Sequence, residues 1–273
     1  TPLVRAGLSL VASAGITSLL GLLYWSLAAR RYSPAAIGAT AALLAAMEIV
    51  AAVANLGLRT ALIRFVPALG DRAARVVAVS YGVAGLTALL GAGVFGLVHE
   101  RWFDELDLLD HTAGVTFFLL SCVLWVIFSL QDSVLIGLRR ATWVPTENAL
   151  YALAKLALLV GLTSTLPRWG VYVSWTAPLV LMVLAVNIPV FRMLRAPRPA
   201  PAEDLTIRDL LRFSAGDYLA SALWLLTIDA LPLLMLVLVG AEGGAWYHLA
   251  WTVAYTLYLV SSAVGYALLA EGA

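Results

Sequence analysis

The sequence predicts an all-α polytopic membrane protein, and two observations carry this prediction. Hydrophobic residues make up 62% of the 273 positions and charged residues only 12%, with a mean hydropathy of +0.94. So few charges cannot coat the surface of a water-soluble domain of this length. The chain also contains eight apolar runs of about the 20 residues that a helix needs to cross a bilayer. We therefore expect eight transmembrane helices.

Local signals justify several of these helices. Ser33 and Pro34 supply an N-cap and a first-turn proline for the second span, so only a tight turn separates it from the first. Pro178 and Pro232 each remove an intrahelical hydrogen bond and predict a kink in the sixth and seventh spans. We expect the eight spans near residues 7–29, 35–57, 75–98, 113–137, 145–165, 169–191, 213–239 and 244–269.

The arginines predict how these spans are oriented. Arg30, Arg31, Arg101 and Arg168 fall in connections on one side, which makes four. The other side receives the remaining twelve: Arg5, Arg59, Arg64, Arg72, Arg75, Arg139, Arg140, Arg192, Arg195, Arg198, Arg208 and Arg212. Because basic residues accumulate in cytoplasmic connections, we expect the N-terminus in the cytoplasm and the protein in the cytoplasmic membrane.

The chain divides into three expected parts. Residues 1–191 form a six-helix lobe, residues 192–212 a proline-rich cytoplasmic linker with an interfacial helix, and residues 213–273 the first two helices of a second lobe. A shift of about 207 residues aligns the second span with the last one, which favours a pseudo-symmetric repeat. Since the chain begins without Met and stops directly after a span, we expect it to be part of a protein with at least twelve spans.

Three stretches carry a resemblance to a known family. They are FVPALG after LGLRTALIR, LQDSVLIGLRRATWVPTENALYALAKLALL at 130–159, and the run from 208 to 271. Together they resemble the polysaccharide-biosynthesis, Wzx-like flippase branch of the multidrug/oligosaccharidyl-lipid/polysaccharide (MOP) exporter superfamily. The resemblance implies a MATE-like fold in which two six-helix lobes enclose a cavity. It also implies export of lipid-linked oligosaccharides from the cytoplasmic to the outer leaflet.

The first candidate site lies on the second span. At 100° per residue, Asn55 and Arg59 each fall within about 20° of Glu48, on one face of the helix. A carboxylate inside an apolar span is expected to face a bundle interior or a wet cavity beside a cation. The stripe either lines a substrate cavity or ties this span to a neighbour.

Two further candidates lie on the fifth span. Asn148 and Lys155 are seven residues apart and share a face, with Tyr151 close to it. Lys155 is too far from either surface to snorkel readily. Its ammonium is expected to contact a substrate phosphate or to pair with Glu48.

The sequence predicts less specific roles for the remaining acidic residues. Asp229 is the deepest, and it either lines the cavity or acts as a structural partner. Asp132 and Asp217 lie near the cytoplasmic ends of their spans, where an interfacial position or pairing with Arg139, Arg140 or Arg212 is expected. The segment 99–111 holds five carboxylates and two histidines without ligand spacing, and we expect a solvated acidic loop.

Several chemistries lack a motif in the sequence. The chain shows no glycine-rich phosphate loop, no Ser/His/Asp arrangement and no metal-ligand spacing, and Cys122 is its single cysteine. We therefore expect no enzyme activity, cofactor, metal site or nucleic-acid partner.

Transport is the expected function. The resemblance implies a lipid-linked, polyprenyl-pyrophosphate glycan as substrate, with membrane lipids and a coupling H⁺ or Na⁺ as further partners. A MATE-type cation-coupled multidrug antiporter is one alternative, and it would favour acidic lining at Glu48 or Asp229. A membrane scaffold for polysaccharide assembly is the other alternative.

Overall fold

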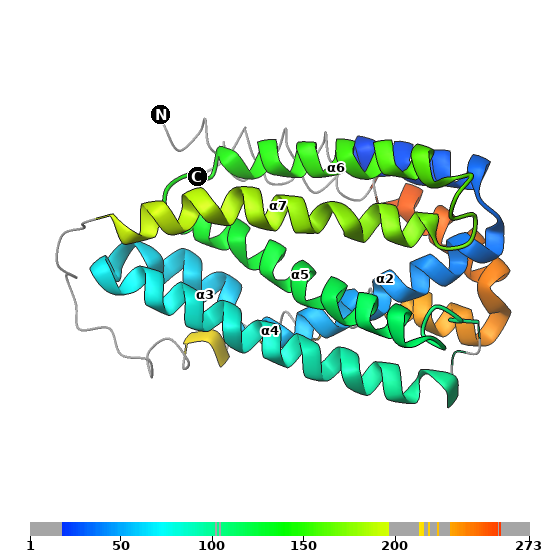
Figure 1. Ribbon diagram of the computed structural model, residues 1–273, viewed down its shortest axis with the longest axis horizontal. Coiled ribbons are helices and arrows are strands. Elements are labelled where there is room, and N and C mark those ends of the chain that lie inside the picture. The colour runs from blue at the N-terminus through cyan, green and yellow to red at the C-terminus, as the bar shows by residue number, and fades with distance from the viewer. Residues whose placement is uncertain are drawn as a thin grey trace.

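A computed structural model describes residues 18–101, 103, 105–196, 213–215, 218, 223, 230–255 and 257. These residues form helices and connections, and no strand occurs among them. The predicted all-helical class is therefore confirmed over the described part of the chain. The helices run roughly along the long axis of the bundle (Figure 1).

The elements follow the predicted order through the first six spans. After a helix over residues 18–31 come α2 (Pro34–Ala54), α3 (Leu58–Phe65), the 3₁₀ turns η1 (Val66–Ala68) and η2 (Gly70–Arg72), α4 (Ala73–Val98), η3 (His99–Arg101), α5 (Thr112–Gly137), α6 (Trp143–Leu162) and α7 (Gly170–Arg195). A further helix spans Ala230–Tyr255.

The predicted start of α2 is confirmed. Ser33 is its N-cap, and the hydroxyl oxygen accepts a hydrogen bond from the backbone N–H of Ala36 at 3.2 Å. Pro34 occupies the first turn, where its missing N–H leaves no intrahelical bond unmade.

The predicted continuation of this helix to Arg59 is wrong. Helix α2 ends at Ala54, and Leu56 and Gly57 adopt left-handed φ angles of 48° and 71°. Glycine takes this conformation without the clash that a Cβ would cause. The chain therefore changes direction before α3 begins at Leu58.

Five helices within the described residues are long and apolar enough to cross a membrane: Pro34–Ala54, Gly70–Val98, Thr112–Gly137, Gly170–Arg195 and Ala230–Tyr255. The fifth predicted span corresponds to α6, which is not among the five, and the first is described only from residue 18 onward. Several long apolar helices indicate a multi-pass membrane protein.

The last two predicted spans differ from the expectation. A break was expected between residues 239 and 244, but helix is assigned continuously over Ala230–Tyr255. Gly240 lies inside this helix with a left-handed φ of 74°, and the orange ribbon turns in Figure 1. The direction change is thus made by one residue rather than by a loop.

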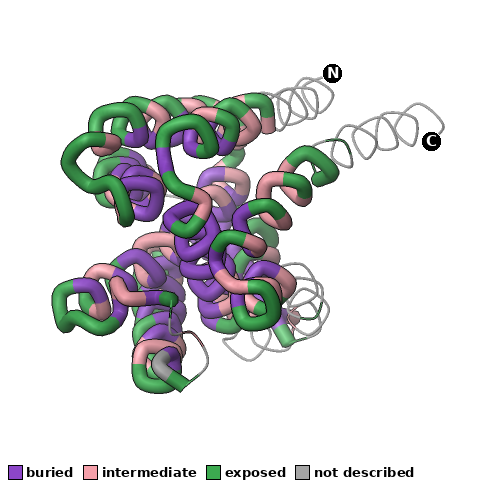
Figure 2. Tube along the Cα trace, turned by 90° about the vertical axis from the view of Figure 1, so that its right-hand side faces the viewer, coloured by how far each residue is buried: buried purple, intermediate pink, exposed green. Residues whose placement is uncertain are grey.

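Helix α2 is the centre of the bundle. Of its most apolar window, 78% is buried inside the protein, against 22% for Gly70–Val98. Its alanine-rich sequence lets α4, α5 and α7 approach closely. Figure 2 shows buried residues along the middle of the bundle and exposed residues along its outer sides. Exposed leucines such as Leu86, Leu90 and Leu97 lie on α4, as expected for a helix that faces lipid.

Segments after the predicted linker pack on the N-terminal helices. A Cβ on Gly38 would collide with the backbone carbonyl of Ala241. The imidazole of His248 lies 4.2 Å from the ring of Trp25, centroid to centroid. The described part of the C-terminal region therefore lies directly against α2 and the helix over residues 18–31.

Candidate functional site

The predicted stripe on the second span is not continuous. Because the helix breaks at residues 55–57, Arg59 belongs to α3 and the 100° spacing from Glu48 no longer applies. Glu48 is partly buried and lies close enough to Cys122 of α5 and Tyr151 of α6 to interact electrostatically with both. Arg59 is exposed and lies close enough to Asp132 of α5 to interact electrostatically with it.

Lys155 lies in a cage of aromatic rings. Its side chain is only 6% exposed, and its ammonium is 3.4 Å from the ring centroid of Trp175 and 5.1 and 5.2 Å from those of Tyr24 and Tyr151. Aromatic faces attract a cation, most strongly where water is excluded. The cage thus replaces part of the hydration that this ammonium loses inside the bundle. Its predicted pairing with Glu48 stays a prediction.

A buried polar network joins α5, α6 and α7. The side-chain amide of Gln131, fully buried, donates to Glu147 Oε1 at 3.3 Å, and its oxygen accepts from Asn187 Nδ2 at 2.6 Å. Glu147 is only 4% exposed. Buried polar groups are stable only when they are hydrogen-bonded, so this network fixes the relative positions of the three helices.

Asp132 and Asn148 extend the same network. Asn148 Nδ2 donates to Asp132 Oδ2 at 3.5 Å, while Asp132 Oδ1 and Glu147 Oε2 are buried without a hydrogen-bond partner among the described residues. No ion pair joins Asp132 to Arg139 or Arg140 among the described residues, where α6 supplies Asn148 as its partner instead. The expected interfacial position of Asp132 stays a prediction. Asn148 was predicted from the sequence as a site residue, and the structure places it here rather than beside Lys155.

Sequence reasoning missed Gln131, Glu147 and Asn187. The available signal was a pair of adjacent polar residues, Gln131-Asp132 and Glu147-Asn148, in each of two consecutive apolar helices. Helical spacing within one span cannot show that two such pairs meet. Their contact depends on how α5 and α6 pack.

A cavity of about 460 Å³ lies beside the network. Its wall comes from α4, α5 and α7: Tyr81, Ile127, Val183, Leu184, Asn187, Ile188, Phe191, Arg192 and Arg195. Asn187 belongs both to the cavity wall and to the network. The wall is mainly apolar, and two arginines lie at the end of α7. Glu48, Arg59 and Lys155 are not among the lining residues.

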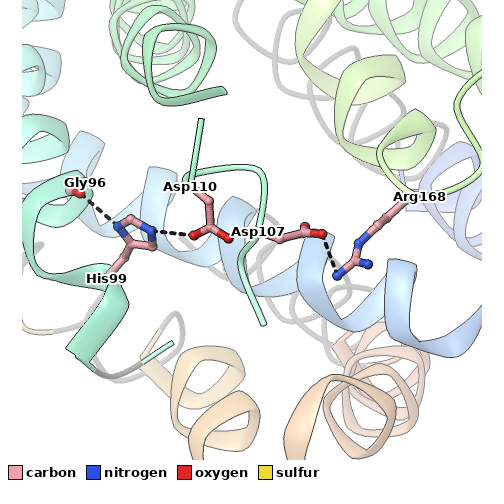
Figure 3. Close-up of polar contacts among 5 residues, drawn as sticks. All are labelled: Gly96, His99, Asp107, Asp110 and Arg168. Carbon is pink, nitrogen blue, oxygen red and sulfur yellow. Dashed lines mark hydrogen bonds and ion pairs between the residues drawn. The ribbon is translucent and has the colours of Figure 1, made fainter. Parts of the chain in front are cut away.

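The segment 99–111 is more ordered than the predicted solvated loop. Figure 3 shows His99 between the Gly96 carbonyl, 2.8 Å from Nδ1, and Asp110 Oδ1, 3.4 Å from Nε2. Asp107 Oδ2 lies 2.8 Å from a terminal nitrogen of Arg168. Leu106 and Leu109 in the same segment are buried. Asp110 and Asp107 thus contact His99 and Arg168 instead of facing only water.

Glu105 contacts the C-terminal region from the same segment. Its Oε2 accepts a hydrogen bond from the backbone N–H of Ala241 at 2.6 Å, next to the left-handed Gly240. The segment thereby holds the turn in the helix over Ala230–Tyr255.

Two predicted acidic residues, Asp217 and the site candidate Asp229, lie outside the described residues. Within the described part, no group of three or more His, Cys, Asp or Glu side chains could hold a metal ion. Comparison with protein-family models, with curated proteins and with solved structures gives no match to this chain.

Proposed function

We propose that the protein moves a lipid-linked oligosaccharide or polysaccharide precursor across the cytoplasmic membrane by exposing a cavity alternately to the two sides. The observation that carries this proposal is the cavity of about 460 Å³, whose mainly apolar wall ends at Arg192 and Arg195. The resemblance of the sequence to Wzx-like flippases supplies the class of substrate.

The chemistry of the cavity suits such a substrate. A pyrophosphate headgroup is anionic and cannot cross hydrocarbon without groups that replace its water. Guanidinium groups do this well, because they make paired, charge-assisted hydrogen bonds to phosphate oxygens. Leu184 and Ile188 of the cavity wall are exposed on α7. A cavity that opens sideways to the bilayer beside these two residues would leave the lipid tail among the lipids while the headgroup enters.

The membrane potential can drive this movement. With the cell interior negative, moving net negative charge outward gains about 2.3 kcal/mol per charge per 100 mV. Nucleotide hydrolysis is then not required by the energetics.

Arg59 remains a proposed contact for the headgroup. It lies on α3 beside Asp132 and is exposed. Lys155 is proposed with it as a deeper contact, although its ammonium is held over Trp175. The cavity adds Arg192 and Arg195, which sequence reasoning did not single out.

Charge removal tests the proposal in the full-length parent protein. In cells that carry only the variant, Arg192→Gln with Arg195→Gln should make lipid-linked glycan accumulate on the cytoplasmic leaflet, while the amount of protein in the membrane stays unchanged. Arg140→Gln is the matched control, because Arg140 is exposed and does not line the cavity. Absence of accumulation, even in a strain lacking the gene, would contradict the flippase assignment.

A MATE-type antiporter is the second candidate, favoured by the buried carboxyl groups of Asp132 and Glu147. Loss of such an antiporter would make cells drug-sensitive without glycan accumulation. A membrane scaffold, the third possibility raised by the sequence, would tolerate loss of both the arginines and the carboxyl groups.

A further inference from the structure

A short strap, residues 105–111, lies at the end of the bundle where α4 ends and α7 begins. Leu106 and Leu109 of the strap are buried in the hydrophobic core. Asp107 Oδ2 lies 2.8 Å from a terminal nitrogen of Arg168, just before α7 (Figure 3). These contacts hold the strap on the part of the chain that precedes the predicted linker.

One side chain of the strap reaches across to the helix over Ala230–Tyr255. Glu105 Oε2 accepts a hydrogen bond from the backbone N–H of Ala241 at 2.6 Å. Because the helix changes direction at Gly240, where φ is 74°, the N–H groups that follow the turn lose their carbonyl partners four residues earlier. A Cβ on Gly240 would lie only 3.0 Å from Glu105 Oε1. The turn thus presents a donor and leaves room for the carboxylate.

Ala241 also packs on α2 from the other side of its backbone. Its carbonyl approaches Gly38 so closely that a Cβ there would collide with it. Beside this contact lies a second cavity, of about 300 Å³, whose wall includes Glu105, Ala241 and Ala39 of α2. The side chain of Ala39 is only 3% exposed. This cavity marks the seam where the strap, α2 and the helix over Ala230–Tyr255 meet.

The contacts of the strap differ in how easily they break. Of those named here, only the Glu105 hydrogen bond joins the strap to the helix over Ala230–Tyr255. Glu105 is exposed, so water can replace both partners of this bond at a small net cost. Leu106 and Leu109, in contrast, would have to leave the core. The seam can therefore open while the strap stays in place.

The larger cavity lies toward the opposite end of the bundle. Helix α7 runs from Gly170, next to the strap, to Arg195, and Arg192 and Arg195 line the cavity of about 460 Å³. A protein that exposes such a cavity alternately to two sides must close one end while the other is open. The seam at the strap is the closed end in this structure.

We propose that Glu105 is a releasable clasp that closes this end of the bundle. It holds the turn at Gly240 and Ala241 against α2, and the end opens when the helix over Ala230–Tyr255 moves away. Opening breaks the bond between Glu105 and Ala241, water takes over both partners, and the contact at Gly38 separates. The part that this opening plays in substrate movement rests on the proposed transport function, whereas the opening itself does not.

Cysteine alkylation in the purified full-length protein measures the opening without any substrate. Ala39→Cys places a thiol in the seam, where the closed clasp shields it from a hydrophilic maleimide. Adding Glu105→Ala should raise the alkylation rate about tenfold, because a hydrogen bond to a charged group no longer holds the seam shut. Glu105→Gln keeps an acceptor oxygen without the charge and should raise the rate less. The native Cys122 is buried and should give no background.

Two controls separate opening at the seam from general loosening. Glu242→Ala should leave the rate at Ala39→Cys unchanged, because Glu242 is an exposed carboxylate directly beside Ala241. Ala92→Cys on α4, a fully buried position, should stay unreactive with and without Glu105→Ala. An equal rise at both cysteines would mean that Glu105 stabilises the whole bundle, and it would refute the clasp.

Other outcomes also decide the proposal. Rapid alkylation of Ala39→Cys while Glu105 is intact would show that the seam is not closed, and a rate that ignores Glu105→Ala would show that Glu105 does not close it. Either result overturns the clasp. Ala36→Cys lines the same cavity and is 2% exposed, so it replaces Ala39→Cys if that variant fails to fold.

The two proposals fail differently. Faster alkylation with Glu105→Ala, but no glycan accumulation in the deletion strain, would keep the clasp and remove the flippase. Glycan accumulation in the deletion strain, with an alkylation rate that does not depend on Glu105, would do the reverse.

Discussion

Lys155 shows how a single charge is accommodated inside this bundle. An ammonium at this depth has lost most of its water, and the face of Trp175 lies 3.4 Å from it. Tyr24 completes the cage from the helix over residues 18–31, and Tyr151 from α6, the helix of Lys155 itself. The lysine therefore ties three parts of the lobe together through one side chain. Aliphatic neighbours would provide no comparable attraction.

Pairwise substitution measures this attraction. Lys155→Met and Trp175→Leu should be less than additive in their effect on stability, with a coupling of about 1–2 kcal/mol, because either change alone already removes the cation–π contact. Thermal unfolding of the singles and the double in one detergent gives the coupling. Trp143 serves as the control, because it lies on α6 as Lys155 does but is exposed. The effects of Lys155→Met and Trp143→Leu on stability should therefore be additive. Strict additivity of Lys155→Met with Trp175→Leu would refute the cage as an energetic unit.

At the scale of elements, packing of the C-terminal helix depends on glycine positions in and beside α2. Gly38 lies within α2 where the carbonyl of Ala241 approaches its Cα. Gly57 combines a left-handed φ with a close approach of the Ser214 carbonyl. Any side chain at these positions would have to push a backbone away.

Alanine at Gly38 should therefore destabilise the protein by about 1–3 kcal/mol, since a backbone atom rather than a flexible side chain must move. Gly82 is the matched control, because it lies within α4 and a Cβ there meets nothing within 4 Å. Gly82→Ala should be neutral or should stabilise by about 0.5–1 kcal/mol through the helix propensity of alanine. Thermal unfolding of both variants decides, and equal effects would contradict the packing of α2 on Ala241.

At the scale of the whole molecule, the connections alternate between two ends. The connections over residues 54–73 and 137–143 and the C-terminal end of α7 lie at one end of the bundle (Figure 1). The connections over residues 98–112 and 162–170 lie at the other end. This arrangement agrees with the predicted division of the described arginines between the two sides. The direction in which the bundle crosses the membrane is a separate prediction from the excess of arginine at the first end.

Cysteine labelling tests that direction. His111 and Arg140 are both exposed and lie at opposite ends of the bundle, His111 at the end predicted to face outward. A membrane-impermeant thiol reagent added outside cells should therefore label His111→Cys and should not label Arg140→Cys. The native Cys122 is buried and should give no background. Permeabilised cells should show labelling at both positions. The reverse pattern in intact cells would invert every statement about sidedness.

The sequence by itself determined the helical membrane class, the ends of α4, α5 and α7 to within a few residues, the cap at Ser33 and the alternating placement of arginine. These features are local, because apolar length, capping residues and charge follow from the chain's own chemistry. Only the tertiary structure decided the break at Gly57, the continuity of helix through Gly240 and the meeting of Gln131 with Glu147. Each of these depends on which helices pack together and at what rotation, and periodicity along one helix carries no information about the side chains of its neighbour.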